Sequence, residues 1–354
     1  MHIPVLPHET IAAFSRNIKD VTEPRCFVDG TVGFGGHSKA ILQHFTNAII
    51  LCVDRDPEVL SIAQANLAEF HGRVSFSNGS YIDLETHLEA NGFPTEVDGI
   101  LLDLGANSFH FDAARRGFSV LNDGPLDMRF NQQDTQLETA ANAVNTLSEV
   151  QLTKIFRDFG EEKLAKEFAK AIVREREERG NMFETTKDLR DCIERIANMW
   201  KSVGKGKKSK RKGKLTSKFG SIHPATRCFQ ALRIYVNDEL THVESGVKQL
   251  VNHLALNGRL LTIAFHSLED RSIKHFFREL DKQGRTNVDE DEDEEWKEED
   301  SDEKAENESR NDVNPLCRKR FRLARRKATK ATAEEVAINS RSRSARLRCL
   351  ERIQ

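Results

Sequence analysis

The stretch Cys26-Phe-Val-Asp-Gly-Thr-Val-Gly-Phe-Gly-Gly-His37 decides the fold of this chain. It begins with a short apolar run that ends at Asp29 and continues with four glycines, at positions 30, 33, 35 and 36. Ser38, a suitable N-cap, then opens a helix-like segment that extends to Phe45. A strand, a glycine turn and a helix start together bring backbone N–H groups close to a ligand. The stretch therefore predicts the first β-α unit of a ligand-binding α/β domain.

The alternation of strands and helices continues to Asp103. The expected strands are 26–29, 49–53, 74–77 and 97–103. The helices expected between them are 38–45, 57–70 and 84–90. This alternation is typical of a parallel, doubly wound sheet, and right-handed crossovers place the carboxyl ends of its strands at one edge. We therefore expect Asp29, Asp54, Tyr81 and Asp103 to lie along that edge.

The pattern changes after the fourth strand. No strand signal is present from about residue 104 to 220, where three segments have the apolar spacing of helices, namely 146–159, 161–180 and 186–201. The α/β pattern then resumes with a helix at about 224–256, a turn at Asn257-Gly258, a strand at 259–265 and a helix at about 266–280. A final strand is expected within 344–353. These changes predict an all-helical domain inserted into the α/β domain.

Charge is strongly segregated although the formal net charge is only −2. Residues 289–308 contain 14 acidic residues and two lysines. Residues 201–218 contain nine lysines and arginines and no acid, and residues 316–354 contain 13 against three acids. Two basic tracts indicate a polyanionic partner, most simply nucleic acid, although a solvated loop or tail is the alternative for each tract.

Together these patterns predict five parts of the chain. They are a first α/β part (1–106), an inserted helical domain (107–220) with a Lys-rich loop at 201–218, a second α/β part (221–284), an acidic disordered loop (285–313) and a basic C-terminal segment (314–354).

Several protein classes are disfavoured by the sequence. No apolar run reaches the roughly 18–20 residues of a membrane span, and the first residues resemble neither a secretory signal nor a transit peptide. We therefore expect a cytoplasmic protein without a membrane partner. The six cysteines include no Cys-x-x-Cys pair, which disfavours a disulfide framework and a zinc site. The oligomeric state is not indicated.

The glycine turn favours S-adenosylmethionine over a dinucleotide. It does not match G-x-G-x-x-G, because Ser38 stands where the third glycine would be. Asp54 ends the second strand, where a carboxylate can accept hydrogen bonds from ribose hydroxyls. S-adenosylmethionine carries a sulfonium cation and no phosphate, so acidic strand ends suit it. A purely structural turn and a site of an NAD dehydrogenase are the alternatives.

Two further strand ends carry candidate functional residues. Asp103 is followed by Leu-Gly-Ala-Asn-Ser-Phe-His110, and could contact the methionine amino group, orient a substrate or simply cap a turn. His266 follows the fifth strand and is a candidate acceptor or base, while Ser267 and Asp270 have the spacing of a capping box. A serine hydrolase is disfavoured because the chain has no G-x-S-x-G motif.

Several motifs, taken together, resemble the MraW/RsmH family of small-subunit ribosomal RNA cytosine-N4 methyltransferases. They are Asp29-Gly-Thr-Val-Gly-Phe-Gly-Gly-His37, Asp54-Arg-Asp-Pro57, Ile100-Leu-Leu-Asp-Leu-Gly105, Arg116-Gly-Phe-Ser119, Asp123-Gly-Pro-Leu-Asp-Met-Arg129, His223-Pro-Ala-Thr-Arg227, Phe229-Gln-Ala-Leu-Arg-Ile234, Phe265-His-Ser-Leu-Glu-Asp-Arg271 and Asn339-Ser-Arg-Ser-Arg-Ser-Ala-Arg346. The resemblance implies a class I (Rossmann-like) S-adenosylmethionine methyltransferase sheet with an inserted helical domain. It also implies methylation of N4 of a cytidine in the decoding region of small-subunit (16S) ribosomal RNA, either as free RNA or in the small ribosomal subunit.

The resemblance also implies the cofactor contacts, residue by residue. Matching positions are Gly35, Gly36, His37, Asp54 and Asp103. Two further contacts fall on departures from the family pattern. Tyr81 stands where the family has Phe, and His110 stands where it has Gln. The family's Val-Ser-Ser-Pro is Ala106-Asn-Ser-Phe109 here. The acidic loop and the Lys-rich loop are not expected of the family.

The cytosine amine is a poor nucleophile, because its lone pair is delocalised into the ring. An enzyme must hold N4 in line with the methyl–sulfur bond and accept hydrogen bonds from the amine. The candidate acceptors are Asp103, Asn107 and His266, and no metal is required. The target base must be unstacked to be reached. The alternatives are methylation of another RNA site or of a protein, and a non-catalytic RNA-binding ribosome-assembly factor.

Overall fold

The computed structural model describes residues 3–178, 180, 182–206, 223–284 and 319–354. The predicted acidic loop at 285–313 and most of the Lys-rich loop at 201–218 lie outside these residues. The chain divides into two compact units. The first combines Met1–Leu104 with Val243–Gln354, and the second is Gly105–His242. Each unit is described by itself.

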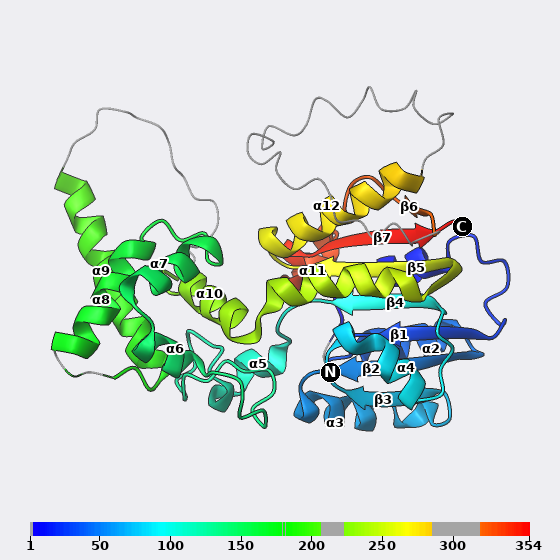
Figure 1. Cartoon of the computed structure of the whole chain (residues 1–354), viewed down its shortest axis with the longest axis horizontal. Coiled ribbons are helices and arrows are strands. Elements are labelled where there is room, and N and C mark those ends of the chain that lie inside the picture. The colour runs from blue at the N-terminus through cyan, green and yellow to red at the C-terminus, as the bar shows by residue number, and fades with distance from the viewer. Residues whose placement is uncertain (1–2, 179, 181, 207–222, 285–318) are drawn as a thin grey trace. The chain divides into compact units, whose positions relative to one another are not determined.

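The first unit contains one seven-stranded sheet (Figure 1). Its strands are β1 (Arg25–Asp29), β2 (Ala48–Asp54), β3 (Val74–Asn78), β4 (Val97–Asp103), β5 (Leu254–Ala264), β6 (Phe321–Leu323) and β7 (Arg346–Arg352). The strand order is β3-β2-β1-β4-β5-β7-β6, in which β1 to β5 are parallel and β7 is antiparallel to both β5 and β6. The order reverses between β1 and β4, and ligands of such sheets bind at the carboxyl ends beside this reversal. The predicted class I Rossmann-like fold is confirmed.

Helices cover both faces of this sheet because successive strand residues point to opposite sides. Phe27, Ile50 and Leu101 pack with α1 (Pro7–Ser15), α2 (Gly36–His44) and α3 (Pro57–Asn66). Their neighbours in the chain pack on the other face, with α4 (Leu84–Ala90), α11 (Glu239–Leu250) and α12 (Ser267–Gly284). The strands β2 and β4 are buried on both faces, as the nearly continuous apolar run of β4 predicts.

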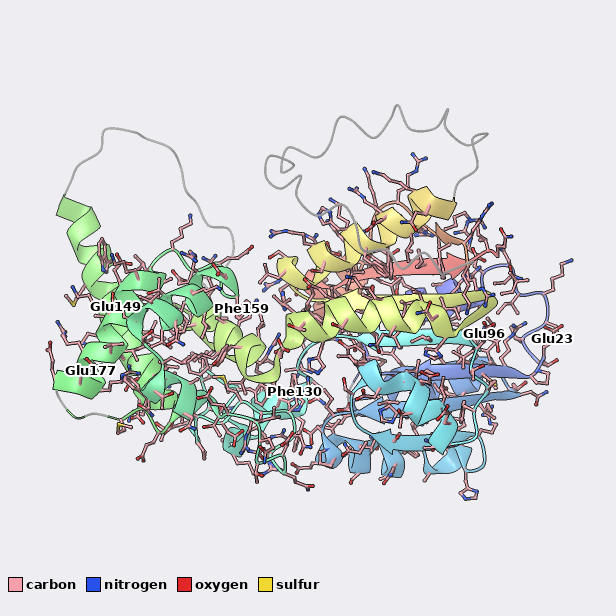
Figure 2. The ribbon with its side chains drawn as sticks, in the orientation of Figure 1. Glu23, Glu96, Phe130, Glu149, Phe159 and Glu177 are labelled. Carbon is pink, nitrogen blue, oxygen red and sulfur yellow. The ribbon has the colours of Figure 1, made fainter. Side chains whose placement is uncertain are left out.

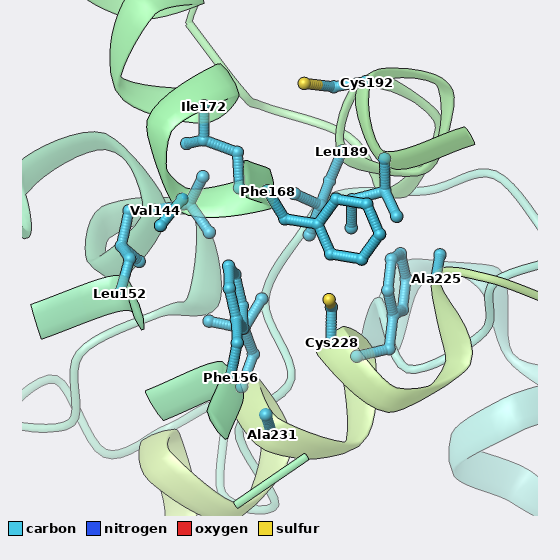
Figure 3. Close-up of a cluster of buried hydrophobic side chains, with 14 of the residues drawn as sticks. Val144, Leu152, Phe156, Phe168, Ile172, Leu189, Cys192, Ala225, Cys228 and Ala231 are labelled. Carbon is cyan, nitrogen blue, oxygen red and sulfur yellow. The ribbon is translucent and has the colours of Figure 1, made fainter. Parts of the chain in front are cut away.

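The second unit is helical. Its helices are α5 (Ser108–Asp112), α6 (Ala140–Thr146), α7 (Glu149–Asp158), α8 (Ala165–Glu178), α9 (Thr186–Gly206) and α10 (Thr226–Asn237). Buried residues of α6 to α10 form a separate core, in which Phe156, Phe168 and Cys228 lie close together (Figure 3). Ser148 and Gln151 form a capping box at the start of α7, which satisfies backbone groups there. Within the described part of this unit, Pro125 and Thr185 form a lone β-bridge and no strand is present.

The structure differs from the predicted elements where local geometry breaks a pattern. The predicted helix 224–256 is two helices, because Asp238 has a left-handed backbone (φ 48°) that ends α10. Helix α10 packs its apolar face into the core of the second unit, so this unit extends past residue 220 to His242. The predicted turn at Asn257-Gly258 lies inside β5, where Asn257 has φ 65° and the pairing with β4 shifts register. The short strand β6 was not predicted.

The C-terminal strand β7 is joined to the rest of the first unit by ion pairs with buried carboxylates. Arg346 and Arg348 both donate to the Asp270 carboxylate of α12, at 2.8 Å. Arg259 of β5 pairs with Glu351 at 2.9 Å and also donates to carbonyl oxygens of α1. These bonds connect the basic C-terminal segment to β5 and α12, which explains why arginines occur in a strand of the sheet.

A second group of hydrogen bonds fixes the opposite end of β7. Glu96, labelled in Figure 2, immediately precedes β4 and accepts hydrogen bonds from Lys319 and Arg352 at 2.7 Å. These hydrogen bonds are the largest lowering influence on the pKa of Glu96, which lies below its ordinary value. Among the described residues, no helix combines the length and apolar character needed to cross a bilayer.

Candidate active site

The glycine turn after β1 adopts the backbone that its sequence predicts. Gly33 and Gly35 have φ values of 54° and 81°, a region that glycine enters without steric cost. Gly35 is the residue before α2, and a Cβ there would lie 2.9 Å from the Leu67 side chain. The helix therefore starts at Gly36, two residues before Ser38, so the predicted N-cap role of Ser38 is wrong. The turn holds the chain close to the carboxyl end of β1.

Ser38 instead forms a hydrogen bond with Asp29. Its hydroxyl donates to the fully buried Asp29 carboxylate at 2.6 Å, and the Thr31 backbone N–H approaches the other oxygen at 3.3 Å. Burial raises the pKa of Asp29 in spite of these hydrogen bonds. Asp29 therefore joins β1 to α2 from inside the protein, and the serine in the third-glycine position has a structural reason.

Asp54 is held at the end of β2 by the turn itself. One carboxylate oxygen accepts from the Gly33 backbone N–H at 2.9 Å, and the other accepts from the Asp56 N–H at 3.0 Å. Burial raises the pKa of Asp54 to about 6, although both hydrogen bonds lower it. Each oxygen retains a further lone pair that can accept from a ligand.

His37 and Asp103 meet at the point where the strand order reverses. The buried His37 ring places Nε2 3.6 Å from an oxygen of Asp103. Burial lowers the pKa of His37, but Asp103, together with the charges of Asp29 and Glu335, outweighs this effect and the pKa is raised. The Asp103 backbone N–H donates to the Thr31 hydroxyl at 2.6 Å, which fixes the end of β4. Sequence reasoning missed Thr31, although it lies within the glycine stretch.

Polar atoms of this pair lack hydrogen-bond partners within the described part of the chain. They are both ring nitrogens of His37 and Oδ1 of Asp103. Buried polar groups are normally hydrogen-bonded, and an unsatisfied one costs free energy. An imidazole that Asp103 holds towards its charged form, beside a carboxylate, suits a ligand carrying both a carboxylate and an ammonium group. The methionine part of S-adenosylmethionine is such a group.

Tyr81 lies just beyond β3 and packs in the core of the first unit. Its ring lies against α11 at Gly246, where a Cβ would come within 2.3 Å of the ring, and its Cβ lies close to Gly30. The aromatic residue expected after the third strand is thus buried beside the glycine turn.

The whole chain matches one family of known proteins. The model of the MraW methylase family matches residues 1–353. This chain belongs to the MraW methylase family. Three similar proteins are each named "Ribosomal RNA small subunit methyltransferase H". They come from Shewanella sediminis (35% identity, 100% of this chain and 98% of that protein), Parvibaculum lavamentivorans (38%, 99% and 89%) and Rhodospirillum rubrum (37%, 100% and 94%).

His266 of this MraW-family methylase is engaged in a local cap. It precedes α12, and its Nδ1 is 3.4 Å from the Glu269 backbone N–H. Its Nε2 lies 3.0 Å from the Glu269 carboxylate, which also accepts from the Phe265 N–H. His266 and Glu269 thus occupy the positions that the sequence assigned to a Ser267–Asp270 capping box. That prediction is wrong because Asp270 pairs with the arginines of β7.

Asn107 and His110 of the methylase lie in the second unit, where they cap α5. The Asn107 side chain accepts from the His110 backbone N–H at 3.3 Å, and His110 Nδ1 accepts from the Asn107 N–H at 3.1 Å. The His110 ring is buried beside Phe118 and Phe130. Both side chains therefore have hydrogen-bond partners, whereas Asp103 Oδ1 has none among the described residues.

The affinity of the methylase for S-adenosylmethionine is expected to fall as the pH drops below about 6. The raised pKa of Asp54 means that its carboxylate takes up a proton in this range, where an ordinary aspartate stays ionised. The protonated group is a weaker acceptor for ribose hydroxyls. Calorimetric titration between pH 5 and 8 measures the effect.

An Asp54→Asn variant is the control for this pH dependence. It should bind more weakly at pH 8 and should lose most of the change between pH 5 and 8, because its side chain does not titrate. Equal pH profiles for the variant and the wild type would show that Asp54 is not the titrating group.

Proposed function

We propose that this chain transfers the methyl group of S-adenosylmethionine to N4 of a cytidine in the decoding region of 16S ribosomal RNA. The observation that carries the proposal is the His37–Asp103 pair at the strand-order reversal, of which three atoms have no hydrogen-bond partner among the described residues. The full-length relatives of the chain are named ribosomal RNA small subunit methyltransferases. The RNA target follows from these relatives, and N4 specificity follows from the family resemblance. Free 16S RNA and the small subunit, both cytoplasmic, are the candidate substrates.

Different residues of the first unit bind different groups of the cofactor. Asp54 accepts from the ribose hydroxyls, Asp103 accepts from the methionine ammonium, and the cationic form of His37 faces the methionine carboxylate. Gly35 and Gly36 allow backbone N–H groups at the start of α2 to come close to the same carboxylate. The bound cofactor supplies a methyl group on an already activated sulfonium, so the protein's task is to orient the amine.

Asp103 is also the acceptor that we favour for the amino group of the target cytosine. Asn107 already uses its acceptor atom in a helix cap. His266 accepts in a cap through Nδ1, so its Nε2, which has no hydrogen-bond partner among the described residues, carries the ring hydrogen and cannot accept from an amine. Asp103 Oδ1 has no partner among the described residues. A hydrogen bond from the cytosine amino group to a carboxylate would turn the nitrogen lone pair towards the methyl group. Binding and transfer measurements on the same Asp103 variant separate this role from a role in holding the cofactor.

The second unit is the part that we propose to bind RNA. Four exposed cations, Lys163, Lys166, Lys170 and Arg174, recur at three- and four-residue intervals at the start of α8 and along it. Side chains at this spacing lie on one face of a helix. A row of cations on one face attracts a phosphate backbone and makes binding depend on salt.

Mass spectrometry of 16S RNA tests the proposed reaction. RNA from a strain that lacks the gene should lose one methyl group at N4 of a decoding-region cytidine, and expression of the wild-type protein should restore it. Purified small subunits from that strain should accept labelled methyl from S-adenosylmethionine. Unchanged N4 methylation in the deletion strain would overturn the proposal, and failure to bind the cofactor would favour an assembly factor.

A further inference from the structure

Aromatic and cationic side chains meet at the surface of the second unit, just after β4 in the chain. We call Phe109, Phe111 and Arg115 the aromatic-arginine patch. The guanidinium carbon of the exposed Arg115 lies 5.2 Å from the centre of the Phe109 ring, a cation–π distance. Phe109 is half-buried and Phe111 is 37% exposed. The patch therefore offers planar groups and a positive charge to solvent within the unit.

An aromatic layer lies directly beneath the patch. The ring of Phe111 is 6.3 Å from Phe118, and that of Phe109 is 6.2 Å from His110, both nearly edge to face. Below them, Phe118 stacks on Phe130 at 5.5 Å (Phe130 is labelled in Figure 2). Edge-to-face and offset aromatic contacts are favourable beyond their buried area. The layer supports the outer rings and limits their motion.

A buried arginine fixes the backbone around the patch. Arg116 is 1% exposed, and its guanidinium donates to the carbonyl oxygens of Arg129 at 3.0 Å and Phe130 at 2.7 Å. The same guanidinium lies 5.6 Å from the Phe109 ring centre, so two arginines contact this ring. The Phe130 backbone N–H also donates to the side-chain oxygen of Asn237 at 2.8 Å. A surface fixed in this way loses little entropy when it binds a ligand.

We propose that the aromatic-arginine patch stacks with an unpaired base of the RNA substrate. Single-stranded RNA is recognised by stacking of its bases on aromatic rings and on guanidinium planes, and a guanidinium also attracts the neighbouring phosphate. The patch consists of two rings and one cation, which matches one nucleotide. A stable protein partner would need roughly 800 Å² on each side, which corresponds to about 20–30 residues, and the patch has three. The assignment rests on the proposed action on ribosomal RNA.

Stacking can be tested with a fluorescent base in a single-stranded RNA of the decoding-region sequence. Wild-type protein should quench 2-aminopurine in this RNA, and Phe109→Leu, which keeps an apolar side chain without a ring, should weaken RNA binding by about tenfold and reduce the quenching. Phe109→Trp should restore both. Binding of S-adenosylmethionine to the first unit should stay unchanged in every variant, and an unchanged thermal unfolding profile should show that the second unit is still folded.

Arg115→Lys separates stacking from charge. It keeps the positive charge but removes the planar guanidinium, so it should lose part of the affinity. The matched control is Arg157→Lys, at an exposed arginine of α7 that pairs with Asp158, and it should leave RNA affinity unchanged. An abasic RNA should bind more weakly to the wild type and should not distinguish wild type from Phe109→Leu.

Two results would overturn the proposal. One is equal affinity of wild-type protein for abasic and base-bearing RNA, which does not depend on any variant. The other is a Phe109→Leu variant that binds cofactor and RNA as the wild type does. A protein that binds RNA through Phe109 but transfers no methyl group to small subunits would instead refute the proposed reaction and leave the patch in place.

Discussion

Replacement of Asp103 by asparagine is expected to lower the affinity for S-adenosylmethionine by roughly a hundredfold. The change removes the negative charge that faces His37 and leaves no carboxylate for the methionine ammonium. Loss of a hydrogen-bonded charge at a buried site costs about 2–4 kcal/mol, which corresponds to this factor. It should also lower the pKa of His37, because Asp103 holds that pKa above its ordinary value. Calorimetry measures the affinity, and NMR titration of the imidazole measures the pKa.

Asp98→Asn is the matched control for this prediction. Asp98 lies near the opposite end of the same strand, where it contacts Arg25 and the Cys26 backbone N–H. Its replacement should leave cofactor affinity unchanged. If Asp103→Asn binds the cofactor normally but transfers methyl groups slowly, Asp103 orients the substrate amine and does not hold the ammonium. Normal binding together with normal transfer would remove Asp103 from the active site.

Asp270→Asn is expected to destabilise the first unit by about 3 kcal/mol. The Asp270 carboxylate is nearly buried and receives hydrogen bonds from Arg346 and Arg348, of which Arg348 is itself 9% exposed. Removal of one partner leaves a buried charge uncompensated, which costs more than the ion pair itself contributes. Urea unfolding followed by circular dichroism measures the change, provided that the transition of the first unit is resolved.

The pH dependence of this ion pair has a definite sign. Burial alone would raise the pKa of Asp270, but the hydrogen bonds and charges of Arg348 and Arg346 lower it below its ordinary value. The stabilisation is therefore present above the ordinary aspartate pKa of about 3.9 and is lost as the pH falls further. Glu69→Gln is the control, since the Lys39–Glu69 pair is exposed and such pairs contribute about 0–1 kcal/mol. Equal losses in the two variants would contradict a special role for Asp270.

Much of the fold could be predicted because its signals are local and periodic. Apolar runs followed by acidic residues marked β1, β2 and β4, and these strands differ from the predicted ranges by at most one residue at each end. The break at Asp238 could not be seen, since the apolar spacing continues from α10 into α11 while a single left-handed residue separates them. The extent of the second unit depends on where α10 packs, and that is a tertiary property.

Residues of the candidate site could be predicted from the sequence where they stand at the end of an apolar strand. Asp54 and Asp103 follow apolar strands, and the sheet topology places them at its carboxyl edge. The candidate acceptors His266 and Asn107 lie in segments that begin helices, and there the same polar atoms serve as caps. The interaction of Ser38 with Asp29 depends on a buried distance that no spacing rule contains. Local sequence therefore indicated where the polar groups lie but not which of them remain available.

The second unit separates β4 from β5, although these two strands pair side by side in the sheet. The intervening chain, residues 104–253, is about 150 residues long, where an ordinary crossover has about a dozen. Loop-closure entropy grows only with the logarithm of length, so this difference costs about 2 kcal/mol if the intervening chain is unstructured. The rate of folding is affected more, because pairing across a long separation is slow. Early folding of the helical unit would shorten the effective separation, so mutations in its core should slow assembly of the sheet as well.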